Sequence, residues 1–297
     1  MQRADAEAIK RNKPDLSPNS VITYVAHIKR VRIHAPELSG KKVLKYLDGL
    51  KPHIANQLIS AVVARYPRFR QHVTRYRKLA EKYRDENAQK GTEKQRENWT
   101  SIASIKRAVR LMRRELKQFG FTRDSRLTMA FLSWSIMLEH TMRNDLPSLK
   151  IAETSKDAGG PENYYVVSLG QIWLNKFKTA KAFKRRGLLP LKLQLKKPLK
   201  LLIMRYLRSR KDSNFLISQP DGRPFSKSAF RNLLLNSSKK YLGVKIGSTQ
   251  MRHIVLSEFL AKDPSLLQRK SMARSMQQIK LETQLSYQIR DIDQIAR

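Results

Sequence analysis

The 297-residue sequence contains no cysteine. That absence excludes disulfide bonds, cysteine-ligated zinc, iron–sulfur clusters and a thiol nucleophile. Acidic residues are also scarce, with 24 Asp and Glu against 61 Lys and Arg. Two-metal phosphoryl-transfer sites need clustered carboxylates, so this composition gives them little support. A metal-independent reaction on phosphate groups stays open, in which Arg and Lys offset charge and a hydroxyl group is the nucleophile.

Long hydrophobic runs are missing too. The longest nearly apolar stretch, Leu127 to Leu138, has twelve residues. A membrane-spanning helix needs about 20. Residues 1–7 are mixed in charge and lack the apolar core of a signal peptide. We therefore expect an intracellular protein that does not span a membrane.

Common cofactor and metal motifs are likewise not found. The sequence has no Walker Gly-Lys-Ser/Thr loop and no dinucleotide-binding glycine fingerprint after a predicted strand. Its six histidines show no metal-ligand spacing. The sequence accordingly predicts no cofactor and no metal.

What the chain has in excess is positive charge, with a formal net charge of +37. Hydrophobic residues still make up 40% of the sequence, enough to bury a core. Between Glu162 and Asp212 lie fourteen Lys or Arg and no acidic residue. Such a run indicates a nucleic-acid surface, with a solubilising face as the alternative. Nucleic acid is the leading partner, and an anionic membrane surface is the second.

The hydrophobic pattern predicts two domains joined by a linker. Residues 1–90 are typical of a helical domain, whose first helix has Ser20 as its N-cap. Residues 86–98 are polar, and we place the linker at residues 91–100. Residues 101–297 form the second domain and include a C-terminal tail after Tyr287.

The second domain combines helices with a short β region. From Ile102 to Phe119 an apolar residue recurs every three or four positions, which predicts a helix ending at Gly120. Residues 125–140 are apolar around much of a helix and are predicted to be buried. Residues 164–167 and 172–174 are typical of a β-hairpin, and a third run at 188–189 ends at Pro190. The predicted fold class is mainly α with a small antiparallel β-hairpin or sheet.

Four residues in this domain stand where a solvated surface does not explain them. Arg143 directly follows the predicted buried helix, and Lys178 lies in the hairpin region. Arg252 stands at the start of an apolar helix, and Tyr287 lies near the C-terminal end. Each alone is a weak signal, since a Tyr is usually a core residue and an Arg at a helix end usually a surface residue. Their order and spacing are less ordinary.

Together these residues resemble the catalytic domain of tyrosine recombinases, the phage-integrase-like enzymes of DNA strand exchange. The resemblance covers residues 92–287 and rests on four short motifs. They are Arg143 followed by Asp145-Leu146, Phe177-Lys178-Thr179, Met251-Arg252-His253, and Met276-Gln277-Gln278-Ile279, which falls where the family has Leu-Gly-His-Ser. Gln278 precedes Tyr287 by nine residues, the family's usual interval. Residues 93–95, 97–99 and 175–183 particularly resemble recombinases of large DNA viruses and virophages.

The resemblance implies a fold, an activity and partners. The fold is a helical core-binding domain that holds double-stranded DNA, followed by an α+β catalytic domain. The activity is site-specific recombination or integration for a mobile element or virus, through a 3′-phosphotyrosyl intermediate and without metal or ATP. The implied assembly is a homotetramer on DNA. The protein is then located with DNA in the nucleus, a viral factory or the cytoplasm.

The resemblance also implies residue roles. Tyr287 is the nucleophile, Arg143 and Arg252 hold the phosphate, and Lys178 protonates the leaving oxygen. Thr249 and Gln278 stand where the family has histidines. Both can donate a hydrogen bond to a phosphate, but neither acts as a base near pH 7. The predicted DNA-binding residues are Arg70, Arg75, Lys176, Lys181, Lys184, Arg185 and Arg186.

Two other functions remain open from the sequence. The loss of both histidines is compatible with a catalytically degenerate descendant that binds DNA without cutting it. A basic RNA-binding or structural protein is the third alternative. It predicts no β-hairpin next to a cluster of the two arginines, the lysine and the tyrosine.

Overall fold

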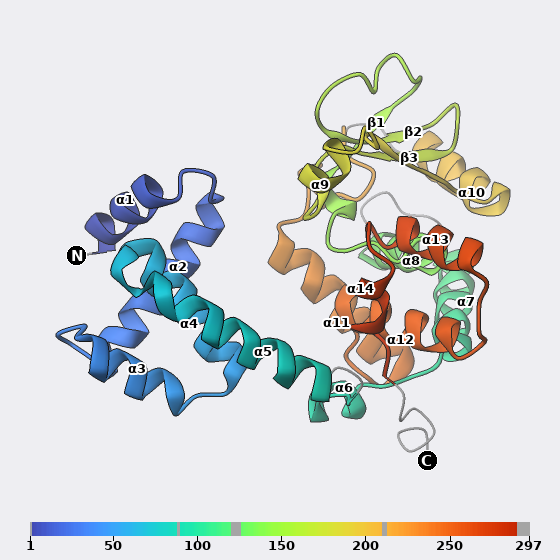
Figure 1. The fold of residues 1–297 in the computed structure, drawn as a ribbon. Coiled ribbons are helices and arrows are strands. Elements are labelled where there is room, and N and C mark those ends of the chain that lie inside the picture. The colour runs from blue at the N-terminus through green and yellow to red at the C-terminus, as the bar shows by residue number, and fades with distance from the viewer. Residues whose placement is uncertain (1, 88–89, 120–125, 210–212, 290–297) are drawn as a thin grey trace. The chain divides into compact units, whose positions relative to one another are not determined.

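The computed structural model describes residues 2–87, 90–119, 126–209 and 213–289. The chain forms two compact units, Met1–Ala88 and Gln89–Arg297, and is mainly helical with one small sheet (Figure 1). The predicted helix end at Gly120 and the tail beyond residue 289 lie outside the described residues. Among the helices described, none combines the length and the apolar character needed to cross a bilayer.

The first unit is entirely helical within its described residues. Its elements are α1 (Gln2–Asn12), α2 (Pro18–His34), α3 (Gly40–Asp48), α4 (Pro52–Arg65), the 3-10 helix η1 (Pro67–His72) and α5 (Val73–Asn87). Helix α4 packs against both α2 and α5, because its apolar residues face in more than one direction. Leu58, Ile59 and Val62 are each at most 1% exposed and form the centre of this core.

The start of this unit differs from the sequence prediction. Helix α2 begins at Pro18, and its N-cap is Ser17, whose Oγ accepts a hydrogen bond from the backbone N–H of Ser20. The prediction of Ser20 as the cap was therefore wrong. Pro18 explains the earlier start, since the fixed φ of proline suits the first turn of a helix and its missing N–H costs nothing there.

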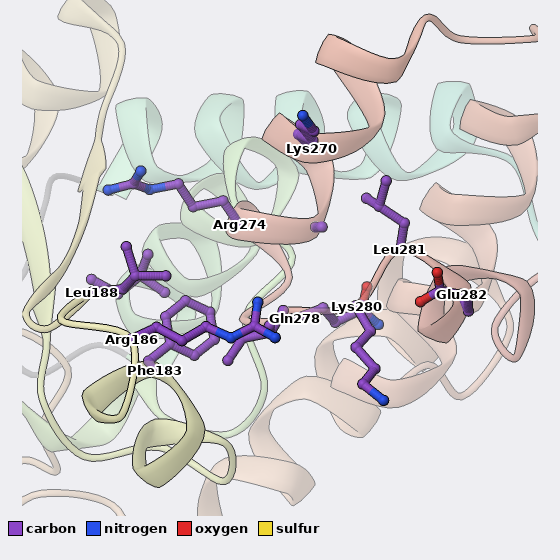
Figure 2. Close-up of a pocket in the computed structure, with 12 residues that line it drawn as sticks. Phe183, Arg186, Leu188, Lys270, Arg274, Gln278, Lys280, Leu281 and Glu282 are labelled. Atoms are coloured by element: carbon purple, nitrogen blue, oxygen red, sulfur yellow. The ribbon is translucent and has the colours of Figure 1, made fainter.

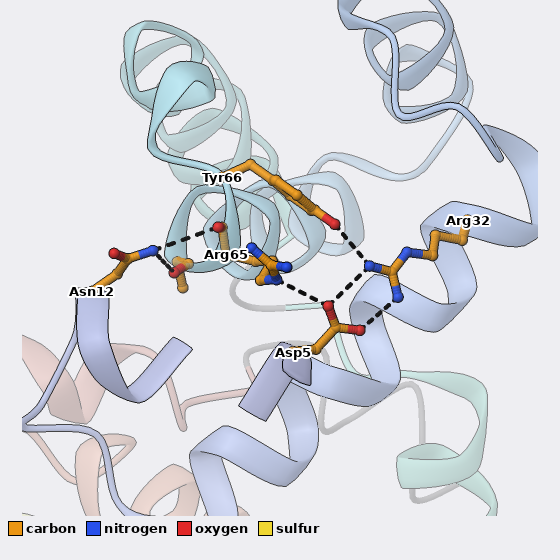
Figure 3. A network of polar contacts seen from close by, with 6 residues as sticks. Asp5, Asn12, Arg32, Arg65 and Tyr66 are labelled. Atoms are coloured by element: carbon orange, nitrogen blue, oxygen red, sulfur yellow. Dashed lines mark hydrogen bonds and ion pairs between the residues drawn. The ribbon is translucent and has the colours of Figure 1, made fainter. Parts of the chain in front are cut away.

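A buried carboxylate helps to hold helix α1 to the unit (Figure 3). Asp5 is 3% exposed and accepts hydrogen bonds from Arg32 at 2.5 and 2.9 Å and from Arg65 at 3.0 Å. Arg32 also donates to the hydroxyl of Tyr66 at 2.7 Å. Burial raises the pKa of Asp5, but the two guanidinium groups outweigh it and lower the pKa below its ordinary value. The charge of Asp5 thus ties α1 to α2 and α4.

The second unit contains the sheet and the remaining helices. Its elements are α6 (Glu93–Glu97), α7 (Ile102–Phe119), α8 (Arg126–Glu139), the 3-10 helix η2 (Leu146–Ser148), β1 (Leu149–Ala152), β2 (Asn163–Val166), β3 (Gln171–Leu174), α9 (Ala180–Lys184), β4 (Leu191–Gln194), α10 (Lys197–Arg208), α11 (Lys227–Leu242), α12 (Ser248–Leu260), α13 (Leu266–Ser275) and α14 (Glu282–Leu285). Helix α8 packs against α7, α10 and α11, which buries it as its composition predicts.

The sheet has four strands in the order β1-β2-β3-β4 and is mixed. Strands β2 and β3 form the predicted antiparallel hairpin, and β4 pairs antiparallel with β3. Strand β1 pairs parallel with β2, so the small sheet is mixed, whereas the sequence predicted an antiparallel one. The third predicted run, residues 188–189, was expected to end at Pro190, but the strand in this region, β4, begins after Pro190, at Leu191. A proline lacks the N–H that a paired strand donates, whereas residues 191–194 alternate buried and exposed.

The predicted linker at residues 91–100 contains a short helix. Thr92 and Gln95 form a reciprocal capping box at the start of α6. The Thr92 hydroxyl accepts from the Gln95 N–H, and the Gln95 side chain accepts from the Thr92 N–H. This capping pattern stabilises a helical turn in a polar segment that has no apolar face of its own.

We expect Asp5→Asn to lower the free energy of unfolding by about 1–3 kcal/mol at pH 7, because two part-buried arginines lose their carboxylate partner. The folded-state pKa of Asp5 is depressed, so its contribution is present above its ordinary pKa of 3.8 and is lost as the pH falls through the lower folded value. Urea unfolding at several pH values measures both effects. The control is Glu7→Gln, whose carboxylate is 61% exposed. An equal loss in the two variants would contradict the role of Asp5.

Candidate active site

The candidate site is built on a buried arginine of α12. Arg252 is 1% exposed, although it is charged. Its Nη1 donates to the Thr141 carbonyl at 2.7 Å, and its Nη2 donates to the Met276 carbonyl at 2.9 Å. These two bonds join α12 to the chain after α8 and to the end of α13. Burial lowers the pKa of Arg252 to about 10, so it stays charged at neutral pH.

Arg143 lies in the irregular segment between α8 and η2. This segment is held to the start of α12, because the hydroxyl of Ser248 donates to Asn144 Oδ1 at 2.7 Å. The segment is also fixed at the end of α8, where His140 Nε2 donates to the Gln194 carbonyl at 2.8 Å. The segment that carries Arg143 is therefore fixed by hydrogen bonds to α12, the helix that carries Arg252, and to Gln194.

Tyr287 follows α14 and lies against Arg252. The guanidinium carbon of Arg252 is 4.9 Å from the centre of the Tyr287 ring. His253 fixes the backbone at the same place, since its Nδ1 donates to the Tyr287 carbonyl at 2.9 Å. Two residues further on, the N–H of Ile289 donates to Ser257 Oγ at 2.8 Å. The backbone is thus attached to α12 at Tyr287 and again two residues beyond it.

The positive charges act on the hydroxyl of Tyr287. Burial raises the pKa of Tyr287, but Arg252 and Arg143 outweigh this effect and lower it below the ordinary value of 10.0. The same surroundings keep His253 neutral, because burial lowers its pKa and the nearby Arg252 lowers it further. The site therefore stabilises a phenolate and disfavours any additional cation.

Two guanidinium nitrogens in this cluster are buried and unpaired. Neither Nη1 of Arg143 nor Nε of Arg252 makes a hydrogen bond to the described residues. Buried N–H donors on charged groups are costly to leave unpaired, and such exceptions are often found at functional sites. An oxyanion next to Tyr287 would accept from both.

Gln277 connects the three motif segments. It is fully buried, and its Nε2 donates to Asp145 Oδ2 at 2.9 Å. Its backbone carbonyl accepts from the hydroxyl of Thr179 at 2.7 Å. The preceding residue, Met276, supplies the carbonyl that holds Arg252. Residues 276–277 therefore contact all three segments of the chain that carry Arg143, Lys178 and Arg252.

The backbone of Gln277 is left-handed, with φ of 56°. Residues with a Cβ rarely adopt this region, and glycine adopts it without cost. The resemblance to Leu-Gly-His-Ser places this residue at the glycine position. The side chain of Gln277 donates to Asp145. Burial raises the pKa of that carboxyl, while Gln277, Arg143, Lys227 and Arg252 oppose the rise.

The other predicted catalytic residues lie in three different places. Lys178 is exposed in the connection between β3 and β4, next to Thr179. Thr249 is exposed in the first turn of α12 and shares a pocket of about 410 Å³ with Asn144. Gln278 is 5% exposed, and its amide atoms make no hydrogen bond within the described ranges. Among the described residues, none of these three side chains is hydrogen-bonded to Tyr287.

The predicted DNA-binding residues fall into two classes. Lys176 pairs with Glu162 at 2.5 Å, and Arg75 pairs with Asp48 at 3.0 Å, so both already have an acidic partner. The others are exposed and have no ion pair among the described residues: Arg70, Lys181, Lys184, Arg185 and Arg186. Only the residues of the second class carry a positive charge that no acidic residue of the described structure already pairs with.

Sequence reasoning missed the roles of Gln277 and His140. The signal for Gln277 was its place in the Leu-Gly-His-Ser position, which marks a backbone that needs a positive φ. His140 gave no comparable signal, because its partners Gln194 and Ser275 are distant in sequence.

Comparisons with known proteins were made on sequence and on structure. No family model matches the chain, and no curated protein sequence matches it. The solved structures that match the chain include a crystal structure of XerA recombinase, with a TM-score of 0.45 and 13% sequence identity. The match covers 96% of this chain and 92% of that chain. At this identity and TM-score the likeness establishes neither a common fold nor a common activity.

We expect Gln277→Ala to destabilise the protein more than Gln277→Gly does. Both variants leave Asp145 without its partner, but only alanine keeps a Cβ in the left-handed region. The difference in the free energy of unfolding should be about 1 kcal/mol. Urea unfolding of the two variants measures it. Equal stabilities would show that the backbone at this position is not left-handed.

Proposed function

We propose that this protein cleaves and rejoins DNA through a covalent bond between Tyr287 and a phosphate. The observation that carries the proposal is the cluster itself. Arg143 and Arg252 lower the pKa of Tyr287, and each has a buried guanidinium nitrogen without a partner among the described residues. A phosphodiester at this position would receive hydrogen bonds from both arginines and an attack from the tyrosine.

The proposed reaction exchanges one phosphodiester for another. The Tyr287 oxygen bonds to phosphorus and loses its proton, while the bond from phosphorus to the 5′ oxygen of the next nucleotide breaks. The DNA retains a 3′-phosphotyrosyl end, and the leaving strand ends in a 5′-hydroxyl. Attack by a 5′-hydroxyl reverses the step and releases Tyr287. Because one ester bond replaces another, no ATP is needed.

Each neighbouring group has a role that its chemistry supports. The arginines hold the non-bridging oxygens, whose negative charge grows in the transition state. The lowered pKa raises the fraction of Tyr287 that is phenolate near neutral pH. Lys178 gives a proton to the leaving 5′ oxygen. Thr249 and Gln278 would donate hydrogen bonds to the phosphate once DNA brings them into contact with it.

Strand exchange needs more than one active site. Two duplexes contain four strands to be cut, so we propose a homotetramer on double-stranded DNA. The formal charge of +37 favours such binding through the phosphate backbone and makes it sensitive to salt. On this proposal the protein works wherever its DNA is kept within the cell.

We expect a denaturant-stable protein–DNA adduct when the protein is mixed, without metal, with nicked duplexes from the ends of its own element. Tyr287→Phe should abolish the adduct and leave DNA affinity within about twofold, since one hydroxyl adds little to a backbone-dominated interface. The control is Tyr241→Phe, whose hydroxyl bonds Glu115 rather than an arginine. An adduct that survives in Tyr287→Phe would contradict the assignment of the nucleophile.

Lys178 has a more selective test. We expect Lys178→Ala to slow cleavage of an ordinary phosphodiester by about 10²–10⁴-fold, the usual contribution of general acid catalysis. A substrate with sulfur in place of the leaving 5′ oxygen should be cleaved by the variant nearly as fast as by the original protein, because a thiolate leaves without a proton. Single-turnover rates measure both. Equal slowing on both substrates would show that Lys178 does not supply the proton.

A second function is favoured by the residues at positions 249 and 278. Neither Thr249 nor Gln278 carries an imidazole, so the chain could bind DNA without cutting it. That function predicts tight binding, no adduct on any cognate duplex, and no change in affinity for Tyr287→Phe. The adduct experiment separates the two functions directly.

A further inference from the structure

A pocket of about 630 Å³ lies beside the candidate site, and Gln278 is its one lining residue that has a role in the proposed reaction (Figure 2). Its wall is formed by α9, the start of β4, α13 and the segment that leads into α14. Arg143, Arg252 and Tyr287 do not line it. Its volume is within the range of about 300–1,000 Å³ that is usual for small-molecule sites.

The rim of the pocket is cationic. Arg186, Lys270, Arg274 and Lys280 line it and are exposed, and Glu282 is the single acidic residue in the lining. None of the four cations forms an ion pair within the described part of the chain. Figure 2 shows their side chains spread around Gln278. The rim therefore carries a net positive charge, and its exposed cationic side chains are accessible to an anion.

The interior of the pocket has a different character. Leu188 is 44% exposed there, and the remaining apolar lining comes from Phe183, Leu191, Ala273, Ile279 and Leu281. Gln278 is the one uncharged polar side chain in the lining, and its amide atoms have no partner among the described residues. An apolar wall with one amide suits a flat heterocycle that carries hydrogen-bonding edges.

We propose that this pocket binds one unpaired nucleotide. The base would pack on Leu188 and Leu281, with the guanidinium planes of Arg186 and Arg274 stacking on it and a rotated Gln278 amide bonding its edge. The phosphate would be held by Lys270 and Lys280. Unpaired bases are commonly recognised by this combination of stacking, amide hydrogen bonds and cations. An anionic lipid offers no heterocycle for the amide, and the Asp and Glu side chains of an acidic peptide carry no ring to stack on the guanidinium planes.

The proposal rests on the proposed function only in taking DNA as the partner. Its test compares the Kd of the full-length protein for a perfect duplex with the Kd for the same duplex carrying one unpaired nucleotide. The expected preference for the second is about tenfold, as for one stacked base. A free 5′-mononucleotide serves as competitor in a parallel titration, which separates a nucleotide within DNA from a free one.

Two matched pairs of variants localise the preference. Leu188→Gln should abolish it, whereas Leu169→Gln should keep it, since Leu169 is similarly exposed, at 40%, and does not line the pocket. Arg274→Gln should reduce it, and Arg208→Gln should leave the ratio of the two Kd values unchanged, since Arg208 is exposed and does not line the pocket. Equal affinity of the original protein for the two duplexes, together with no effect of the mononucleotide, would overturn the proposal. Failure to bind the perfect duplex would instead overturn the proposed function.

Discussion

The candidate site depends on the burial of one guanidinium group. Arg252 is 1% exposed and is held by the carbonyls of Thr141 and Met276. A buried charge is stable only where such partners are fixed in position. The chain after α8 and the end of α13 must therefore keep their places relative to α12. Arg143 and Gln277 belong to those same two segments, so the anchoring of one arginine organises the whole cluster.

The cluster is left with an excess of positive charge. Burial raises the pKa of Asp145, and Arg143 and Arg252 both oppose that rise. This excess of positive charge lowers the pKa of Tyr287. The unpaired nitrogens of Arg143 and Arg252 add hydrogen-bond donors that no acceptor among the described residues satisfies. A site of this kind stabilises negative charge that develops during a reaction, which is what phosphoryl transfer requires.

The sequence predicted the helical content, the buried helix before Arg143 and the β2–β3 hairpin, because each follows from hydrophobic period or turn residues within a short window. It did not predict strand β1, whose four residues carry no pattern of their own and pair in parallel with β2, from which ten residues of the chain separate them. It also did not predict the roles of Gln277 and Asp5. Their partners lie 132 residues away for Gln277 and 27 and 60 residues away for Asp5. The order of the motifs made Arg143, Arg252 and Tyr287 candidates for one site. Only the fold shows that the Tyr287 ring lies against the guanidinium group of Arg252.

The central claim is that two arginine charges act on Tyr287. It is tested most directly by an NMR pH titration of the protein labelled with ¹³C at tyrosine Cζ, with the Tyr287 signal assigned from Tyr287→Phe. The account predicts a pKa for Tyr287 below its ordinary value of 10.0 and a higher value in Arg143→Ala. A pKa at or above 10.0 that does not change in Arg143→Ala would contradict it, because burial alone would then control the tyrosine.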